Sequence, residues 1–160
     1  MRLPRFASQV YTEEVEKALP NGKHKIFKDF RLDGKITRVM KYELNKETLV
    51  DIFSTATYGS DWLEIKRPKK FNNLVKEDSE CREEKWADIL LGGGYIVAYE
   101  YDDEEEPIRH KITLDMMKKG LEVFKNKCPY DYANFITENE DYCTCNNLVQ
   151  CVLFGEVVYG

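Results

Sequence analysis

Three consecutive glycines at positions 92–94 separate a stretch with a helical pattern from a stretch with a strand pattern. This order limits the folds that the chain can adopt. Residues 79–91 place apolar side chains at helical spacing, and glycine commonly ends a helix. Residues 95–101 are rich in β-branched and aromatic types, and residues 108–112 alternate between apolar and polar after an acidic turn. This order predicts a helix followed by a β-hairpin, so the chain mixes helices with at least one antiparallel strand pair.

Weaker local signals predict the remaining elements. A loose alternation at period 2 favours a strand, whereas apolar residues three and four apart favour a helix. Helices are predicted over residues 12–19, 48–57, 114–128 and 144–154, and strands over residues 35–44, 61–65 and 157–159.

Several polar residues and glycines mark the ends of these helices. Thr12, Asn45 and either Thr113 or Asp115 have the side-chain oxygens that cap helix N-termini. Gly59 and Gly155 follow the last apolar positions of two helices, where glycine is favoured. No linker rich in Gly, Ser or Pro divides the chain, so we expect one α+β domain. In it, about four helices pack on a small, mostly antiparallel sheet, residues 45–160 form the core and residues 1–40 an N-terminal extension.

Length and composition exclude several classes of protein. The 160 residues are 42% hydrophobic, which is enough for a packed core. No apolar run approaches the roughly 18 residues of a membrane span, and the first residues lack the apolar segment of a signal peptide. Five cysteines without a secretion signal indicate reduced thiols rather than a disulfide framework. We therefore expect a cytoplasmic protein that has no membrane partner.

Charge is distributed unevenly along the chain. Residues 1–80 carry 16 Lys and Arg against 13 Asp and Glu, whereas residues 81–160 carry 8 against 16. A net charge of −5 is poorly suited to binding phosphate backbones, so a nucleic-acid partner is not expected. The acidic run between residues 102 and 106 is interpreted as the tip of the hairpin.

Phosphate and metal sites have no convincing pattern in the sequence. A phosphate-binding glycine loop follows a strand and precedes a helix, and the order around residues 92–94 is the reverse. Cys143, Cys145 and Cys151 do not have the paired spacing of a structural zinc site, and Cys151 is interpreted as a core residue. We therefore predict no cofactor and no metal site.

Catalytic groups are equally scarce. His24 and His110 are the only histidines, and both adjoin basic residues. A Cys–His pair formed by Cys128 and His110 stays open, although nothing in the sequence singles it out. No catalytic residue is assigned, and an enzyme is the third-ranked hypothesis.

Aromatic and charged residues supply the candidates for binding. The basic run at residues 66–70 lies near aromatic residues, a combination that can bind single-stranded nucleic acid, but an exposed loop is the preferred interpretation. Exposed aromatic residues suit a protein interface because they supply contact area at low entropic cost. The candidate binding residues are Trp62, Trp86, Tyr95, Asp102, Asp103, Glu104, Glu105 and Glu106.

Two parts of the chain resemble a known family. Residues 51–62 read D-I-F-S-T-A-T-Y-G-S-D-W, similar to a D-I-x-x-T-A-x-x-G segment followed by tryptophan in small acidic proteins encoded by bacteriophages and mobile elements, notably of gut bacteria. Further segments follow the family's order and spacing: residues 86–95, the acidic hairpin, 111–114, 119–121 and 147–160.

The resemblance covers residues 45–160 and implies a context rather than an activity. Family members commonly have Glu-Gly-Gly before the tryptophan, whereas this chain has Tyr58-Gly59-Ser60, so a site built on those glycines does not transfer. The implied setting is a phage-like element acting inside a bacterial cell. The resemblance supplies no catalytic residues.

Two hypotheses remain ahead of an enzyme. The first is a non-enzymatic module that binds a partner protein or a second copy of itself. As a special case, the acidic hairpin would occupy the basic cleft of a host factor and inhibit it. The alternative is a pocket for a nucleotide-like small molecule, with Trp62 and Trp86 as walls and the amides of residues 92–94 as donors.

Overall fold

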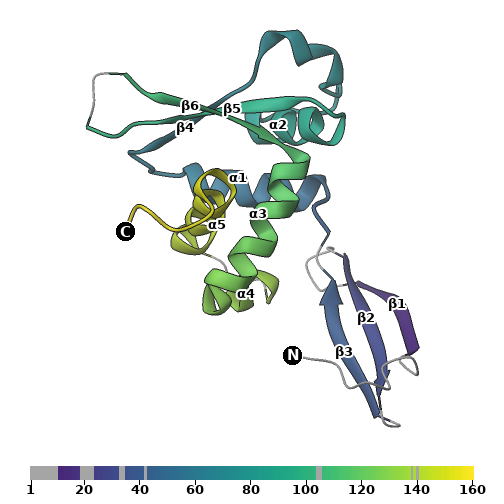
Figure 1. The fold of residues 1–160 in the computed structure, drawn as a ribbon. Coiled ribbons are helices and arrows are strands. Elements are labelled where there is room, and N and C mark those ends of the chain that lie inside the picture. The colour runs from purple at the N-terminus through teal and green to yellow at the C-terminus, as the bar shows by residue number, and fades with distance from the viewer. Residues whose placement is uncertain are drawn as a thin grey trace. The chain divides into compact units, whose positions relative to one another are not determined.

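The computed structural model describes residues 11–18, 24–32, 35–41, 43–103, 106–137, 139 and 141–160. Contact clustering divides the chain into two compact units, Met1–Glu43 and Leu44–Gly160. Each unit contains an antiparallel three-stranded sheet, and the second unit also contains helices (Figure 1). The predicted α+β class is confirmed.

The first unit pairs β1 (Tyr11–Ala18), β2 (His24–Leu32) and β3 (Lys35–Lys41) in that order. The strand predicted over residues 35–44 is confirmed as β3. The helix predicted over residues 12–19 is wrong, because this segment is strand β1. Its backbone pairs with β2, and Glu14 stands opposite Lys28 in the register. Pairing with the next strand along the chain overrides the local helix signal of Thr12.

The second unit has nine elements. In chain order these are α1 (Lys46–Thr57), β4 (Leu63–Lys66), the 3-10 helix η2 (Lys69–Leu74), α2 (Arg82–Leu91), β5 (Tyr95–Glu100), β6 (Ile108–Thr113), α3 (Leu114–Lys127), α4 (Pro129–Ile136) and α5 (Tyr142–Phe154). The predicted hairpin is confirmed, since β5 and β6 pair with Ala98 opposite His110. Strand β4 pairs with the other edge of β5.

The predicted helix caps Asn45, Thr113 and Gly155 are present, whereas Thr12 lies in β1. Asn45 Oδ1 accepts from the Thr48 amide at 2.9 Å, and Thr113, rather than Asp115, caps α3 by accepting from the Met116 amide at 3.2 Å. Gly155 follows α5 with a φ of 74°, which glycine adopts without strain. Local capping chemistry therefore positions α1, α3 and α5 as the sequence predicts.

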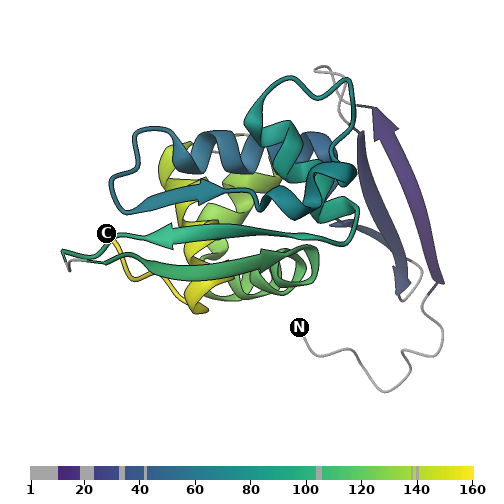
Figure 2. The ribbon, with the colours of Figure 1, turned by 90° about the horizontal axis from the view of Figure 1, so that it is seen from above.

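The core lies between the sheet and the helices. Helices α1 and α5 lie on one side of the sheet β4–β5–β6 (Figures 1 and 2). Alternate strand residues point to that side and are buried, among them Ile65, Ile96 and Ile112. Helices α3 and α5 cross so closely that a Cβ on Gly120 would lie 2.6 Å from Val152 Cα.

Helix α4 has no counterpart in the predictions. Pro129 directly follows the helix predicted over residues 114–128 and occupies the first turn of α4, where a missing N–H costs nothing. The helix buries Phe135, whose ring meets the edge of Phe124 with centroids 6.3 Å apart. Among the described residues, no helix combines the length and apolar character needed to cross a lipid bilayer.

Candidate binding site beside the tip of the acidic hairpin

The segment after α5 is held by a side chain rather than by a strand. Gln150 Oε1 accepts from the amides of Val158 and Tyr159, both at 2.7 Å, and Gln150 Nε2 donates to the Tyr159 carbonyl at 3.1 Å. The strand predicted over residues 157–159 is therefore wrong. The glutamine offers a donor and an acceptor much as a neighbouring strand would, so these backbone groups are paired without a sheet.

This attachment places Tyr159 on Trp62. The two rings stack with centroids 4.7 Å apart and an interplanar angle of 14°. Trp62 Nε1 donates to Asn146 Oδ1 at 3.2 Å, and Asn146 in turn donates to the Ala56 carbonyl at 3.1 Å. Trp62 is only 5% exposed, so most of its ring belongs to the core.

The Tyr159 hydroxyl is one end of a chain of hydrogen bonds that continues through Glu100 to His110. It donates to Glu100 Oε1 at 2.5 Å, and Glu100 Oε2 lies 2.7 Å from His110 Nε2. The hydrogen bond to Glu100 raises the pKa of Tyr159 to about 12. Tyr159 therefore stays protonated at neutral pH and serves as a fixed donor, not as a nucleophile or base.

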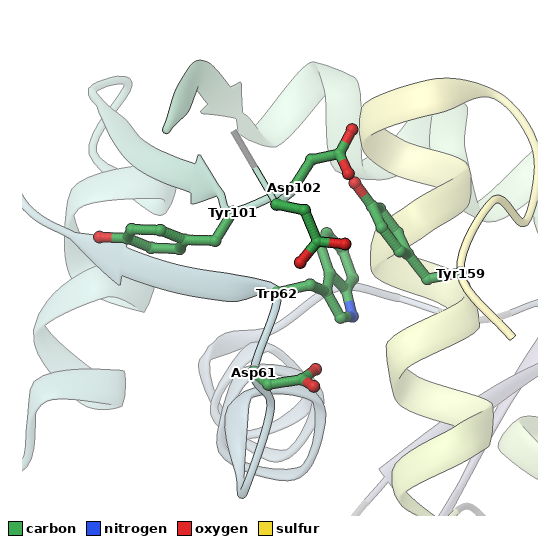
Figure 3. Close-up of a pocket in the computed structure, with 6 residues that line it drawn as sticks. Asp61, Trp62, Tyr101, Asp102 and Tyr159 are labelled. Carbon is green, nitrogen blue, oxygen red and sulfur yellow. The ribbon is translucent and has the colours of Figure 1, made fainter. Parts of the chain in front are cut away.

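A cavity of about 450 Å³ adjoins these rings. The Tyr101 amide donates to the Trp62 carbonyl at 2.8 Å, and this bond holds the start of β4 beside the hairpin tip. The lining residues are Asp61, Trp62, Tyr101, Asp102, Asp103 and Tyr159. In Figure 3, Asp61 and Asp102 lie on opposite sides of Trp62. The lining residues thus include three aspartates and three aromatic residues. The Trp62 and Tyr159 rings lie together in Figure 3, whereas the Tyr101 ring points away from them and its hydroxyl donates to Glu64 Oε2 at 2.7 Å.

Carboxylates and aromatic rings both attract cations. A carboxylate pairs with an ammonium or guanidinium group, and the face of an aromatic ring adds an electrostatic attraction of its own. The cavity is therefore suited chemically to a lysine or arginine side chain or to another organic cation. The sequence indicates Trp62, Asp102 and Asp103 as binding residues but not Asp61 and Tyr101, because the pairing of the start of β4 with the end of β5 brings these two residues in.

The other predicted site residues lie elsewhere. Trp86 is buried in α2 and lines a second cavity of about 420 Å³, which shares Asp61 and Tyr101 with the first. Tyr95 is half-buried at the start of β5. Glu106 is exposed, and Glu104 and Glu105 fall outside the described residues.

The glycines at 92–94 do not present free amides. Gly92, Gly93 and Gly94 donate to carbonyls of α2 at 2.9, 3.2 and 2.8 Å respectively. A Cβ on Gly94 would lie 2.8 Å from the Ile89 side chain, so this backbone is packed against protein. The small-molecule hypothesis thus loses the backbone donors on which it relied.

A second polar cluster joins α1, α2 and the loop between β4 and α2. Lys46 Nζ lies 2.9 Å from Asp88 Oδ1 and donates to Ser79 Oγ at 2.7 Å, while Ser79 donates to Asp88 Oδ2. The hydrogen bond with Asp88 raises the pKa of Lys46. A serine beside a lysine resembles a nucleophile with its base, but a protonated lysine cannot accept the proton. The cluster is structural.

We expect Asp88→Asn to lower the free energy of unfolding by about 2 kcal/mol at pH 7, since hydrogen bonds to a charged group are lost. Burial favours the neutral acid, but bonds from Ser79, the Lys76 amide and Lys46 outweigh it and lower the pKa of Asp88. The carboxylate therefore stabilises the fold above its unfolded pKa of about 3.9, and this contribution disappears as pH falls through the lower folded pKa.

Urea unfolding of both proteins between pH 7 and pH 3 tests this expectation, and the difference between them should shrink toward acid pH. Asp115→Asn is a matched control, because Asp115 forms an exposed pair with Lys119 at 2.9 Å and its loss should cost less than about 0.5 kcal/mol. A constant difference across the pH range would contradict the assignment.

The remaining candidate groups are not arranged for catalysis. His110 contacts Glu100 and the ring of Phe154, whereas Cys128 interacts with Cys151, so the contacts of His110 and Cys128 are with different residues. Burial, followed by the Cys128 thiol, raises the pKa of Cys151 to about 12, and its predicted core position is confirmed. Within the described part of the chain, no three His, Cys, Asp or Glu side chains are placed to hold a metal ion.

Comparison with protein-family models, with curated proteins and with solved structures finds no match. A function is therefore inferred from the cavity beside the hairpin tip and from the chemistry of its lining.

Proposed function

We propose that this protein is a non-enzymatic binding module that receives a lysine or arginine side chain of a partner protein in the cavity beside Trp62. The observation that carries the proposal is the convergence of Asp61, Asp102 and Asp103 with aromatic rings around about 450 Å³. Such a volume accommodates a single long side chain and some water. The special case of an inhibitor of a host factor fits the same chemistry, since nucleic-acid-binding proteins display arginine and lysine.

The rigid wall of the cavity favours a binding function over a catalytic one. Trp62 and Tyr159 are fixed by hydrogen bonds to Asn146, Gln150 and Glu100, so little ordering is required when a ligand binds. We place the module in the bacterial cytoplasm, in the phage-like setting that the family resemblance implies. The five cysteines all lie in the described part of the chain and form no disulfide there, which supports a reducing compartment.

A labelled peptide of alternating arginine and glycine is a direct probe. In a Trp86→Phe background the fluorescence of Trp62 reports on the cavity alone, since the chain has two tryptophans. Neutralising Asp102→Asn together with Asp103→Asn should weaken binding about tenfold, because each accessible carboxylate contributes up to about 1 kcal/mol. The dependence of affinity on salt should become shallower as well.

The matched control is Asp115→Asn with Glu122→Gln, which removes the same charge from exposed positions on α3. This control should leave the affinity unchanged. Equal losses in the two variants, or an arginine peptide that binds no better than its glutamine analogue, would refute the proposal.

A further inference from the structure

The outer face of the sheet β4–β5–β6 carries basic and aromatic side chains that lie apart in the sequence. This face is turned away from helices α1 and α5, and in Figure 2 it is seen in front of them. Strand pairing sets Tyr99 beside Arg109 and Val97 between Lys66 and Lys111. Lys70 of η2 approaches the ring of Tyr95 at 4.8 Å. Residues from three separate segments thus form one basic and aromatic surface, hereafter the outer sheet face.

Cations cover both tyrosine rings of this face. Lys111 Nζ lies 4.6 Å from the centroid of Tyr95. Lys66 Nζ and the Arg109 guanidinium lie 5.3 Å and 5.6 Å from the centroid of Tyr99. All four basic side chains are exposed, so they can move from a ring to an incoming anion without disturbing the sheet.

The electrostatic environment of Tyr95 shows that the local potential is positive. The hydrogen bond with Lys70 is the largest influence on its pKa, and the charges of Lys111 and Arg109 act in the same direction. Together they outweigh desolvation and lower the pKa of Tyr95. The acidic residue on this face, Glu64, lies 3.5 Å from Lys66 Nζ and accepts from the Tyr101 hydroxyl, so its charge is partly compensated.

We propose that the outer sheet face binds single-stranded nucleic acid. Arg109 and Lys111 are two residues apart on β6, and residues so spaced on a strand lie about 6.6 Å apart, close to the spacing of neighbouring phosphates in an extended single strand. Tyr95 and Tyr99 offer ring faces on which bases stack, a mode that requires unpaired bases. An acidic protein would satisfy the cations but would have no use for paired aromatic platforms.

The net charge of −5 does not conflict with this proposal. Asp102 and Asp103 of the cavity lie in the hairpin tip, beyond the last pair, Glu100 with Ile108, and Asp61 precedes β4. The four cations lie along β4, η2 and β6. Long-range attraction to nucleic acid is weakened by the overall charge, but contact electrostatics depend on charges within about a Debye length. From the sequence, only residues 66–70 are recognisable as a basic candidate for nucleic-acid binding, because their partners on β6 are distant in sequence.

Fluorescence anisotropy of the full chain with labelled oligothymidylate tests the charged half of the surface. Four phosphate contacts predict a slope of about −3 for log affinity against log salt concentration. Arg109→Gln with Lys111→Gln should weaken binding at least about tenfold and make the slope shallower by about 1.4. The matched control, Lys118→Gln with Lys125→Gln, removes two exposed lysines of α3 and should change neither quantity.

The aromatic half is tested with Tyr95→Leu, which keeps apolar volume and removes the ring. Loss of one stacked base predicts a decrease in affinity of about 5- to 150-fold. Tyr99→Leu is the second variant, and circular dichroism establishes that both remain folded. A polyglutamate probe, which offers charge without bases, should respond to the glutamine variants but not to the leucine variants.

Several results would overturn the proposal. These are no binding to single-stranded DNA or RNA at low salt, equal affinity for duplex, equal losses in the α3 control, or polyglutamate binding as tightly as the oligonucleotide. The last result would assign the face to an acidic protein. The outcome is independent of the arginine-peptide experiment, because Asp102→Asn with Asp103→Asn leaves the outer sheet face intact.

Discussion

Gln150→Ala is expected to lower the free energy of unfolding by about 3 kcal/mol and to release the segment after α5. Gln150 is 1% exposed and makes four hydrogen bonds, to Asn146, to the Val158 amide and to the amide and carbonyl of Tyr159. Each bond contributes about 1 kcal/mol net, and the partners left behind are partly buried. Without this anchor Tyr159 has no fixed position on Trp62, and the cavity loses one wall.

Urea unfolding followed by circular dichroism measures the loss, and Trp62 fluorescence in the Trp86→Phe background reports the release of Tyr159. Asn147→Ala is a suitable control on the same helix, because Asn147 makes one hydrogen bond, to Asp131 at 3.0 Å. That control should cost less than about 1.5 kcal/mol. If Gln150→Ala unfolds like the control and Trp62 fluorescence is unchanged, the attachment is not what holds the segment.

Gly120→Ala is expected to destabilise the protein by about 3 kcal/mol, although alanine is the better helix former by about 1 kcal/mol. A Cβ at this position would collide with the Val152 side chain and would lie 2.6 Å from Val152 Cα. A flexible side chain could move aside, but a backbone atom of α5 moves only if the helix moves. Separating α3 from α5 would open the core between them, and overpacking of this kind is costly.

Thermal and urea unfolding of the single variant give the sign of the effect directly. Combining it with Val152→Ala should recover only part of the loss, because the contact with the α5 backbone remains. Lys118→Ala, at an exposed position of the same helix, is the control and should be neutral or slightly stabilising. A neutral or stabilising Gly120→Ala would show that α3 and α5 are farther apart than described.

The elements that the sequence predicts well are those whose ends depend on local chemistry. Asn45 and Thr113 cap their helices through bonds to amides three residues on, and Gly155 adopts the left-handed conformation after α5. The hairpin is equally local, because its strands are joined by a short acidic turn. Such signals need no knowledge of distant residues.

The errors arise where a partner outside the segment, even one nearby in the chain, decides the structure. Residues 12–19 have helix-like signals but pair with β2. Residues 157–159 look like a strand but pair with the Gln150 side chain. Each proposed binding surface likewise combines residues that only folding brings together. Asp61 meets Asp102 in the cavity, and Lys66 and Arg109 both lie near the ring of Tyr99. The sequence patterns therefore predicted about half of the residues that line the cavity, but not how these residues are arranged.

In the β5–β6 hairpin, Arg109 and Lys111 lie along β6, and Asp102 and Asp103 lie at the tip. This separation gives the hairpin an electric dipole moment directed along its length. A charged body that approaches from solution therefore experiences a torque before any contact forms, and it arrives already turned toward the face of opposite sign. Ionic strength should consequently act on the rate of encounter more than on the lifetime of the complex once formed.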